Sequence, residues 1–573
     1  MPNFSKRIRH LNLAFFIVFT GILARLFWVG IYEHSLFTTR AEAQQTSKQT
    51  IKAERGEILI HEKDQIFPIA TTKEEWILAI DPRIIKEPES TYNDLKNLVS
   101  IQMPLEEFIA KASKKTDPYE IVEKRLSLDD KKKVQGANLE GVVFTEADAR
   151  FYPGGNFASH VLGFVGADEI GKYGLERLYQ DELAGKDGIL MGEESLGGRL
   201  LLFGKTIENP VVNGSTLETT LDAGVERYLE KSILDVRARY SAESAGGIVI
   251  NPQTGEILAM ASTPSFDPNA YGREKSIEVF KNPNTENLFE MGSVIKPLTM
   301  AAAIDSGAVT PETTYVDTGT REIDGRTISN FDGKARGRVP MQEILSQSLN
   351  LGATFLMEQI GKDRFREYMH NYGLSEKTKI ELPNEAVGNL KNLESTRLIE
   401  YATAAFGQGI SMTPIEFVRA MSSLANGGLL INPYIIHEIR RFNGEVIAHS
   451  SREPKRVLKE ETSKKVTQML VRVVDEKLAN GNGKIPGYSV AAKTGTAQIA
   501  SRDRRGYSEE FLHTFFGYGP AYNPRFLVFY YLEKPQGIRY ASESLTETFR
   551  STMKFLFSYY EVPPDRMQEV VPQ

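Results

Sequence analysis

The spacing of apolar positions changes along the chain and separates three regions. Near the N-terminus the run Leu13–Ala24 is continuous, and it resumes after Arg25 as Leu26–Tyr32. Together these runs reach about the 20 residues that a helix needs to cross a bilayer. From Arg55 to about Asp222, strand-like stretches alternate with charged helical ones. Beyond this point longer apolar patterns begin, which predicts a second folded region.

The second region contains the clearest secondary-structure signals. Ala223–Arg239 has apolar residues at helical spacing, and a longer apolar helix is predicted over Glu290–Ser306. One hairpin is predicted over Gly246–Ser262, around a turn that contains glycine, and another over His513–Glu533. Strands at both ends with helices between them predict an α+β domain, in which an antiparallel sheet is flanked by helices.

The N-terminal apolar run has two interpretations. Lys6, Arg7 and Arg9 precede it and no basic residue follows immediately, which predicts a cytoplasmic N-terminus and a single-pass anchor. Leu13–Ala24 alone also has the length of a signal-peptide core, but the nearest small-x-small site, Ala41-Glu42-Ala43, lies far beyond it. We therefore favour an uncleaved transmembrane anchor, and either interpretation places the rest of the chain outside the cytoplasm.

Composition narrows the function classes. The chain has 573 residues, enough for about three domains. Its net charge is −6 and its pI is about 5.9, so it lacks the basic field of a nucleic-acid-binding protein, and no nucleic-acid partner is expected. It contains no cysteine, which excludes disulfides, thiolate metal sites and a cysteine nucleophile.

A serine and a lysine share one predicted helical turn. Ser293 begins the predicted helix and Lys296 follows at i+3, on the same face. A helix N-terminus offers free N–H groups, and a desolvated lysine can act as a base, so one turn can supply both a nucleophile and its activator. Ser-x-x-Lys is a weak pattern by itself, because Ser551-Thr552-Met553-Lys554 repeats it in a predicted C-terminal amphipathic helix.

Two further motifs strengthen the case that Ser293 and Lys296 are catalytic. Ser348-Leu349-Asn350 lies at a predicted helix-to-loop transition, where its residues could equally be simple caps. Lys493-Thr494-Gly495-Thr496 continues a strand of small residues and could equally be a solvated strand end. Thr494 and Thr496 offer hydroxyls, Gly495 lets a substrate backbone approach an edge strand, and Lys493 offers a fixed positive charge.

The three motifs in this order resemble the signature of penicillin-binding proteins. The resemblance extends from Arg55 to about Pro535 and is strongest for class B members, since no glycosyltransferase domain fits between the anchor and Arg55. One departure is Met291, where the family often has proline, and it affects only a local loop. The following segments also resemble the family: Ala245–Tyr271, Phe406–Pro414, Arg55–Ile58, Arg150–Gly154 and Gly174-Leu175-Glu176.

The resemblance implies a fold, a domain order and a reaction. The expected parts are a cytoplasmic tail (1–12), a transmembrane anchor (13–32), an elongated non-catalytic pedestal or dimerisation-type domain (33–222) and a β-lactamase-like transpeptidase domain (223–573). The expected catalytic residues are Ser293, Lys296, Ser348, Asn350 and Lys493, and the expected substrate-binding residues are Thr494, Gly495 and Thr496. No metal or organic cofactor is expected.

The implied activity is D,D-transpeptidation of peptidoglycan stem peptides, with covalent inhibition by β-lactams. Three alternatives stay open: an elongation-type rather than a division-type transpeptidase, a D-alanyl-D-alanine carboxypeptidase, and a β-lactam sensor or scaffold. The Lys-Thr-Gly-Thr-Ala-Gln run at 493–498 and short pedestal loops favour the division type. The implied partners are the membrane, a polytopic membrane glycosyltransferase, and proteins of the division or elongation complex.

Overall fold

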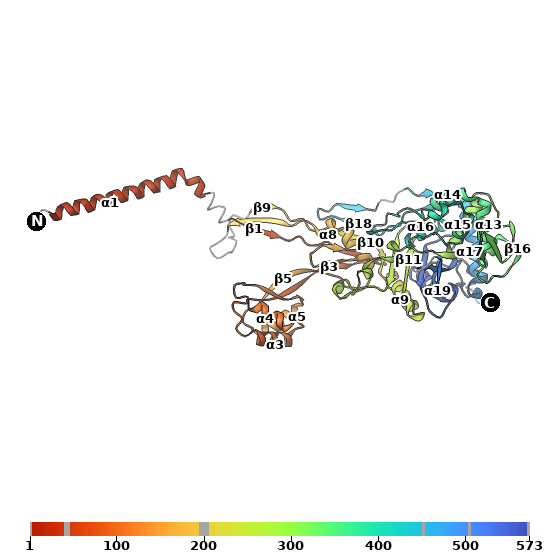
Figure 1. Cartoon of the computed structure of the whole chain (residues 1–573), viewed down its shortest axis with the longest axis horizontal. Coiled ribbons are helices and arrows are strands. Elements are labelled where there is room, and N and C mark those ends of the chain that lie inside the picture. Colours follow the sequence, from red (N-terminus) through yellow and green to blue (C-terminus); the bar gives the residue numbers. More distant parts are fainter. Residues whose placement is uncertain (1–2, 39–45, 194–205, 450–452, 502–505, 570–573) are drawn as a thin grey trace. The chain divides into compact units, whose positions relative to one another are not determined.

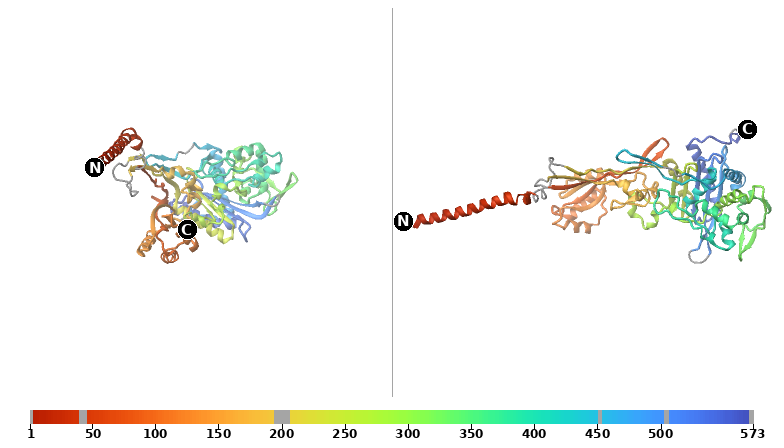
Figure 2. Two further views of the ribbon diagram at one scale, coloured as in Figure 1. Left: turned by 60° about the vertical axis from the view of Figure 1, so that its left-hand side comes forward. Right: turned by 90° about the horizontal axis from the view of Figure 1, so that it is seen from above.

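The computed structural model (Figures 1 and 2) describes residues 3–38, 46–193, 206–449, 453–501 and 506–569. Contacts divide the chain into two compact units, Met1–Glu54 with Ala184–Gly214, and Arg55–Leu183 with Ser215–Gln573. The small-x-small site Ala41-Glu42-Ala43 lies outside the described residues. Each unit is considered by itself.

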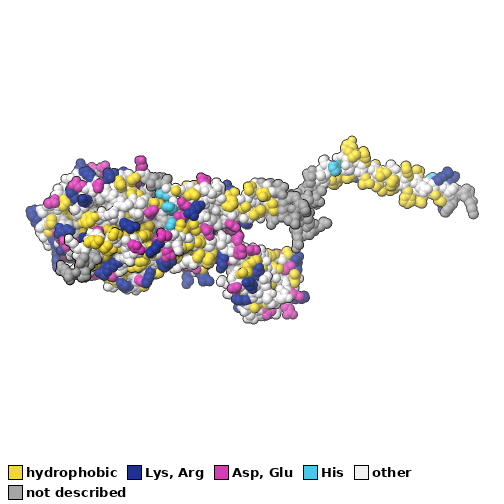
Figure 3. All heavy atoms as spheres, turned by 180° about the vertical axis from the view of Figure 1, so that it is seen from behind, with side chains coloured by type: hydrophobic (Ala, Val, Ile, Leu, Met, Phe, Trp, Pro, Cys, Tyr) yellow, Lys and Arg dark blue, Asp and Glu magenta, His cyan; other side chains and the backbone are white. Residues whose placement is uncertain are grey.

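The first unit begins with one long apolar helix. Helix α1 (Asn3–Phe27) continues as a single π-helical turn, η1 (Trp28–Tyr32), and Arg25 forms an ion pair with Glu33 at 3.3 Å. Hydrophobic side chains cover this helix on the face seen in Figure 3. Among the described residues it is the one helix that is long and apolar enough to cross a membrane, which confirms the predicted single apolar helix at the N-terminus.

The rest of the first unit is a small antiparallel sheet. Strand β8 (Gly188–Glu193) lies between β1 (Thr46–Ile51) and β9 (Thr206–Asn209). Ala53 N–H donates to Asp187 Oδ1 at 2.9 Å, which joins the two chain segments of this unit beside the sheet.

The second unit contains a seven-stranded sheet with the order β19-β18-β10-β2-β3-β4, in which β5 also pairs with β3. Strand β10, from the middle of the chain, pairs in parallel with β2 and antiparallel with β18, so early and late segments share one sheet. Helices α3, α4 and α5 cover its outer strands through a separate small core. The bounds are β2 Ile58–Glu62, β3 Gln65–Ile80, α3 Pro88–Leu98, α4 Leu105–Ala112, β4 Glu120–Leu126, α5 Leu128–Gly136, β5 Val142–Phe151, α6 Ser159–Leu162, β6 Phe164–Val165, β7 Gly171–Lys172, α7 Gly174–Leu178, α8 Gln180–Ala184, β10 Thr216–Asp222, β18 Ile436–Arg440 and β19 Val446–Ala448.

A buried charge cluster organises the segments Arg55–Ile58, Arg150–Gly154 and Gly174–Glu176. Glu176 is fully buried and accepts hydrogen bonds from Arg55, Arg150 and the Tyr152 hydroxyl. Burial alone would raise the pKa of Glu176, but the two guanidinium groups hold it below its usual value. The cluster ties the segment just before β2 to β5 and α7, so these motifs have a structural role.

The second sheet of this unit has five antiparallel strands in the order β12-β11-β23-β22-β21. Its bounds are β11 Ser244–Ile250, β12 Ile257–Thr263, β21 Ala491–Ala500, β22 Tyr507–Gly519 and β23 Phe526–Glu533. Both predicted hairpins are present, as β11–β12 and β22–β23. The predicted antiparallel sheet is therefore confirmed.

Helices cover both faces of this sheet (Figure 1). Strand residues alternate between two cores, as Phe515 and Phe516 of β22 illustrate, because successive side chains point to opposite faces. Helices α9 (Ala223–Arg239) and α19 (Thr546–Tyr559) fill one core, and α11 (Lys296–Asp305) belongs to the other. This arrangement confirms the α+β fold class.

Among the remaining helices, α13, α14 and α17 pack against α11. A capping box begins α16, in which the Thr413 hydroxyl accepts from Glu416 N–H and the Glu416 carboxylate accepts from Thr413 N–H. The bounds are η2 Pro268–Arg273, η3 Ile277–Phe280, α10 Pro283–Glu286, η4 Gly292–Ile295, β13 Thr314–Asp317, β14 Thr320–Ile323, β15 Arg326–Ser329, β16 Gly337–Pro340, α12 Met341–Ser346, α13 Asn350–Ile360, α14 Lys362–Asn371, η5 Lys391–Glu394, α15 Leu398–Ala404, α16 Pro414–Ala425, β17 Leu429–Leu430, β20 Lys455–Arg456, α17 Glu460–Arg472, η6 Val473–Lys477, η7 Leu478–Gly481, α18 Ala541–Ser544 and η8 Met567–Glu569.

Candidate active site

Ser293 lies in a short turn that leads into a buried helix. The predicted continuous helix from residue 290 instead begins with one 3-10 turn, η4, and becomes α-helical at Lys296. Gly292 has a φ of +65°, and its N–H donates to Gly407 O at 3.0 Å. A Cβ on Gly407 would lie 2.2 Å from Gly292 O, so only glycine allows this approach. The segment Phe406–Pro414, which contains Gly407, therefore supports the turn that carries Ser293.

Lys296 is fully buried and is held by three oxygen acceptors. Its Nζ donates to Ser348 O at 2.6 Å, Asn350 Oδ1 at 2.8 Å and Ser348 Oγ at 3.2 Å. Burial lowers the pKa of Lys296 well below its usual value of 10.5, and the nearby charge of Lys493 lowers it further. The neutral form of Lys296 is thus favoured relative to that of an exposed lysine, as a general base requires.

Ser348 lies between two lysines. It occupies the link between α12 and α13 with a φ of +55°, a left-handed conformation that costs on the order of 1 kcal/mol for a residue other than glycine. In this conformation its Oγ accepts from Lys296 Nζ at 3.2 Å and from Lys493 Nζ at 3.1 Å. The strained backbone thus accompanies a hydroxyl that can exchange protons with either lysine.

Lys493 approaches Ser348 from the edge strand β21. Its side chain is only 3% exposed, and Nζ also donates to Thr494 O at 3.1 Å. Burial lowers the pKa of Lys493 to about 7. The sequence suggests a fixed positive charge here, whereas the structure gives a lysine that titrates near neutral pH, because its side chain is buried.

The rest of the motif on β21 has two different environments. Thr496 Oγ1 accepts from Ala541 N–H at 3.0 Å and keeps its own hydrogen for another acceptor. Gly495 faces the nucleophile turn, where an added Cβ would lie 2.7 Å from Met291 O. Glycine at this position therefore leaves room for the η4 turn of the same chain, a reason that differs from the predicted approach of a substrate backbone.

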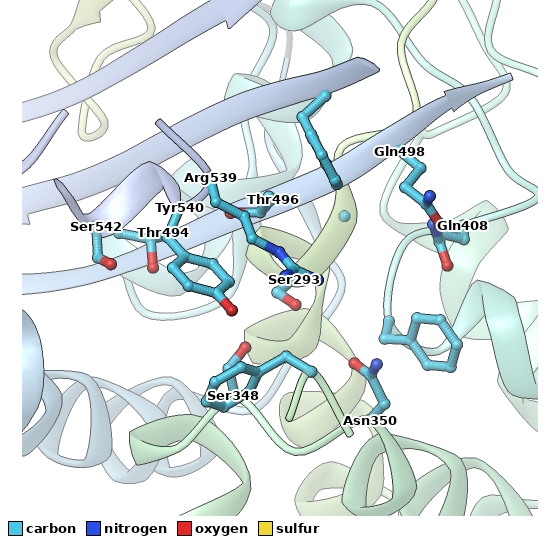
Figure 4. Close-up of a pocket in the computed structure, with 14 residues that line it drawn as sticks. Ser293, Ser348, Asn350, Gln408, Thr494, Thr496, Gln498, Arg539, Tyr540 and Ser542 are labelled. Atoms are coloured by element: carbon cyan, nitrogen blue, oxygen red, sulfur yellow. The ribbon is translucent and has the colours of Figure 1, made fainter. Parts of the chain in front are cut away.

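These elements enclose a cavity of about 410 Å³, within the range of small-molecule sites (Figure 4). Five of the predicted residues line it: Ser293, Ser348, Asn350, Thr494 and Thr496. Lys296 lies behind this wall, Gly495 faces the η4 turn, and Lys493 reaches Ser348 from a neighbouring cavity. The other wall residues labelled in Figure 4 are Gln408, Gln498, Arg539, Tyr540 and Ser542.

Two residues that the sequence did not single out support Asn350. Asn330 Oδ1 accepts from Asn350 N–H at 3.0 Å, and Asn330 Nδ2 donates to the two carboxylate oxygens of Asp317 at 3.0 and 2.8 Å. Asp317 and Asn330 are both buried. In sequence, Asn330 resembles an ordinary turn residue before Phe331, so no local signal reveals this role.

The arrangement brings together a candidate nucleophile, Ser293, two lysines of lowered pKa and a shared hydroxyl. Within the described ranges, no group of His, Asp or Glu side chains is placed to hold a metal ion. The donor set suits acyl transfer through a serine ester, in which Lys296 and Ser348 move protons.

Comparison with known proteins identifies both parts of the chain. The family model "Penicillin binding protein transpeptidase domain" matches residues 245–554, more than half of the chain, and "Penicillin-binding Protein dimerisation domain" matches residues 50–219. The boundary predicted at 222/223 falls between the two matches.

Two curated relatives match over most of their length. Stage V sporulation protein D of Bacillus subtilis is 32% identical over 537 residues, which cover 93% of this chain and 82% of the relative. The probable peptidoglycan D,D-transpeptidase PenA of Neisseria meningitidis is 26% identical over 535 residues, with 93% and 88% covered.

Solved structures agree in fold. Penicillin-binding protein 2X from Streptococcus thermophilus superposes with a TM-score of 0.72 at 22% identity, over 90% of this chain and 81% of that one. Penicillin-binding protein 3 from Mycobacterium tuberculosis, in complex with aztreonam, gives 0.69 at 24% identity, over 90% and 98%. The motifs, the two family models and the first relative agree, and the chain belongs to the penicillin-binding protein transpeptidases.

Proposed function

We propose that this chain is a peptidoglycan D,D-transpeptidase that works through an acyl ester on Ser293. The observation that carries the proposal is the environment of Lys296, a buried lysine with a lowered pKa, one turn from Ser293 and bonded to Ser348 and Asn350. A structural lysine would keep its charge and pair with a carboxylate, whereas this one is surrounded by neutral acceptors.

In the acylation step, Ser293 Oγ attacks the carbonyl of the penultimate D-alanine of a stem peptide. Neutral Lys296 accepts the serine proton, and Asn350 keeps its amine oriented. The backbone N–H groups of Ser293 and Thr496 stabilise the oxyanion that forms. The close packing of Gly495 against the Met291–Val294 turn supports this pairing, because it holds β21 beside the nucleophile.

In the second half of this step, the terminal D-alanine leaves as an amine. Ser348 donates a proton to that nitrogen, and Lys296 and Lys493 on either side of its Oγ supply and tune this proton. Thr494 and Thr496 bind the terminal carboxylate through their hydroxyls. A β-lactam places a strained amide at the same position, so attack by Ser293 gives a stable ester.

The test is product analysis with the purified chain. A stem peptide ending in D-alanyl-D-alanine should release D-alanine, and an added amine-bearing peptide should be joined to the remaining acyl group. If D-alanine is released without any joined product, the chain is a carboxypeptidase. If a labelled penicillin binds but no peptide turns over, it is a sensor or scaffold. If neither adduct nor turnover forms, the proposal fails.

We also propose a membrane orientation for the anchor. Lys6, Arg7 and Arg9 lie at the N-terminal end of α1, which supports a cytoplasmic N-terminus and an extracytoplasmic catalytic domain. We propose that the cytoplasmic tail ends at residue 12, the transmembrane anchor at residue 32 and the pedestal domain at residue 222. Protease added to intact spheroplasts should degrade the catalytic domain, and protection of that domain would reverse the orientation.

Within the cell we propose a role in septal wall synthesis. The partner would be a polytopic membrane glycosyltransferase that contacts the anchor and pedestal and supplies glycan strands. Depletion should give filaments, whereas round cells would indicate elongation. A defect confined to sporulation would instead match the name of the Bacillus relative.

A further inference from the structure

A second cavity adjoins the active site on the far side of Ser348. Its volume is about 680 Å³, and its wall combines β21, the α12–α13 link, the segment 473–482 and the start of α19. The residues that matter here are Ser348, Lys493, Thr494, Asn482, Glu543 and Glu547. The proposed function gives this space no role.

The two cavities share the wall that carries out proton transfer. Ser348 and Thr494 line both of them, whereas Gln408 and Gln498 line only the first. In Figure 4, Thr494 and Ser348 lie to one side of Ser293, and Gln408 and Gln498 lie to the other. An acyl chain that runs along β21 toward Gln498 therefore leaves the side near Ser348 to the departing group.

Two steps of acyl transfer take place on the side of Ser293 near Ser348: departure of D-alanine and attack by the acceptor amine. The D-alanine nitrogen leaves there with a proton from Ser348, and by microscopic reversibility an incoming amine attacks the same carbon along the same path and gives its proton to the same group. The acceptor must therefore occupy space that touches Ser348 after D-alanine has gone. The second cavity meets this condition, and its volume falls in the range of about 300–1,000 Å³ for ligand sites.

We propose that this second cavity is the acceptor site and holds the amine-bearing side chain of a second stem peptide. The inference rests on the proposed function. An ammonium group that enters first loses one proton to water. The neutral nitrogen then forms the new amide bond, one of its protons passes through Ser348 Oγ to Lys296, and the bond between the acyl carbon and Ser293 Oγ breaks as Ser293 regains a proton.

The wall of the second cavity carries charges of both signs. Glu543 and Glu547 are exposed on it, and Glu547 is 3.2 Å from Arg550. Of the cations on the wall, Arg336 is paired with Asp332. Lys477 and the buried Lys493 also line the cavity, so the wall as a whole is not acidic. We expect the shape of the cavity to select the ligand and the exposed Glu543 to attract the amine locally.

The test measures a ratio in one reaction: acyl groups transferred to amine against acyl groups hydrolysed, from a soluble D-alanyl-D-alanine peptide. Asn482→Trp should narrow the cavity and lower the ratio about fivefold for a lysine-bearing stem tripeptide, a difference of about 1 kcal/mol. The small amine hydroxylamine should be affected far less. Glu543→Lys should lower the ratio for the tripeptide through repulsion, more strongly at low salt.

Matched controls are Asn523→Trp and Glu509→Lys, two exposed positions outside both cavities, which should keep the wild-type ratio. The proposal is overturned if the wild-type chain transfers acyl groups and both cavity variants keep its ratio for the tripeptide. An equal loss with tripeptide and hydroxylamine in Asn482→Trp also overturns it, because it indicates a disturbed active site. Absence of any turnover or penicillin adduct in the wild type contradicts the proposed function instead.

Discussion

The chain contains the tetrad Ser-x-x-Lys twice, in two helical regions that differ in every other respect. Lys296 is fully buried beneath the cavity and bonded to Ser348 and Asn350. Lys554 points into solvent from α19, and Ser551 donates a hydrogen bond to the exposed Glu547. Identical spacing on a helix therefore creates reactivity only where the surroundings remove water and supply acceptors.

The packing of the two helices explains the difference. Helix α19 is amphipathic and buries Phe549, Met553 and Leu556 against the five-stranded sheet, which leaves Lys554 outside. In contrast, α11 is buried from Lys296 to Ile304. A helix without an exposed face must place its lysine in the interior, and the cost of that desolvation appears as the lowered pKa of Lys296.

Exchanging each serine gives the largest expected contrast. Ser293→Ala should abolish the covalent adduct with a labelled penicillin, because it removes the proposed nucleophile. Ser551→Ala should form the adduct at the wild-type rate. Peptide mapping by mass spectrometry checks both variants, and an adduct on the Ser551 peptide, or survival of labelling in Ser293→Ala, contradicts the comparison.

Removal of the lysine amine should give the next largest difference in acylation rate between the two tetrads. Lys296→Met fills the same space without a base, so we expect acylation to slow by about a thousandfold, within the usual range for loss of a general base. Lys554→Met should react like the wild type. Stopped-flow labelling gives the rates, and circular dichroism checks that both variants fold. A loss of less than tenfold in Lys296→Met would move the role of base to Lys493.

The pH dependence sharpens the same contrast. The base must be neutral, so its activity is present above its pKa in the folded chain and is lost as pH falls through that value. Burial brings the pKa of Lys493 to about 7 and lowers that of Lys296, and both lysines share Ser348 Oγ. Acylation should therefore rise about tenfold per pH unit at low pH and level off well below pH 10.5, the ordinary pKa of a lysine.

A rate that keeps rising toward pH 10 would mean that both lysines keep their ordinary pKa values, and the two tetrads would then differ only in position. The chain should stay folded over this range, which a melting curve at pH 5 and pH 8 can check. The penicillin's own stability sets the upper limit of the titration.

The sequence predicts the outer frame of this site better than its interior. Both hairpins, helix α9 and the order of the three motifs follow from periodicity and resemblance, because each depends on local pattern. The lowered pKa of Lys493 and the packing of Gly495 against the Met291 turn do not follow, because they depend on contacts between segments that are far apart in the sequence. The role of Asn330 cannot be predicted from the sequence for the same reason, since its contact with Asn350 depends on the tertiary structure.

The smallest expected effect tests whether residues that contact Lys296 only through Asn350 also influence acylation. Asn330→Ala removes the acceptor of Asn350 N–H, and the loss of one buried hydrogen bond, worth about 1 kcal/mol, should slow acylation about fivefold. Asp317→Ala should act similarly by releasing Asn330, while Asp317→Asn keeps an oxygen acceptor and should retain most of the rate. Asn389→Ala, which removes an amide acceptor from an exposed turn, is the matched control.

A shift in the pH profile distinguishes positioning from simple loss of stability. If Asn330 and Asp317 hold Asn350 against Lys296, their loss removes an acceptor that favours the protonated amine, so the midpoint of the acylation profile should move to lower pH. A merely destabilised chain would lose amplitude with an unchanged midpoint. That second outcome would confine the special environment to the residues that touch Lys296, and the tetrads would then differ through their direct neighbours alone.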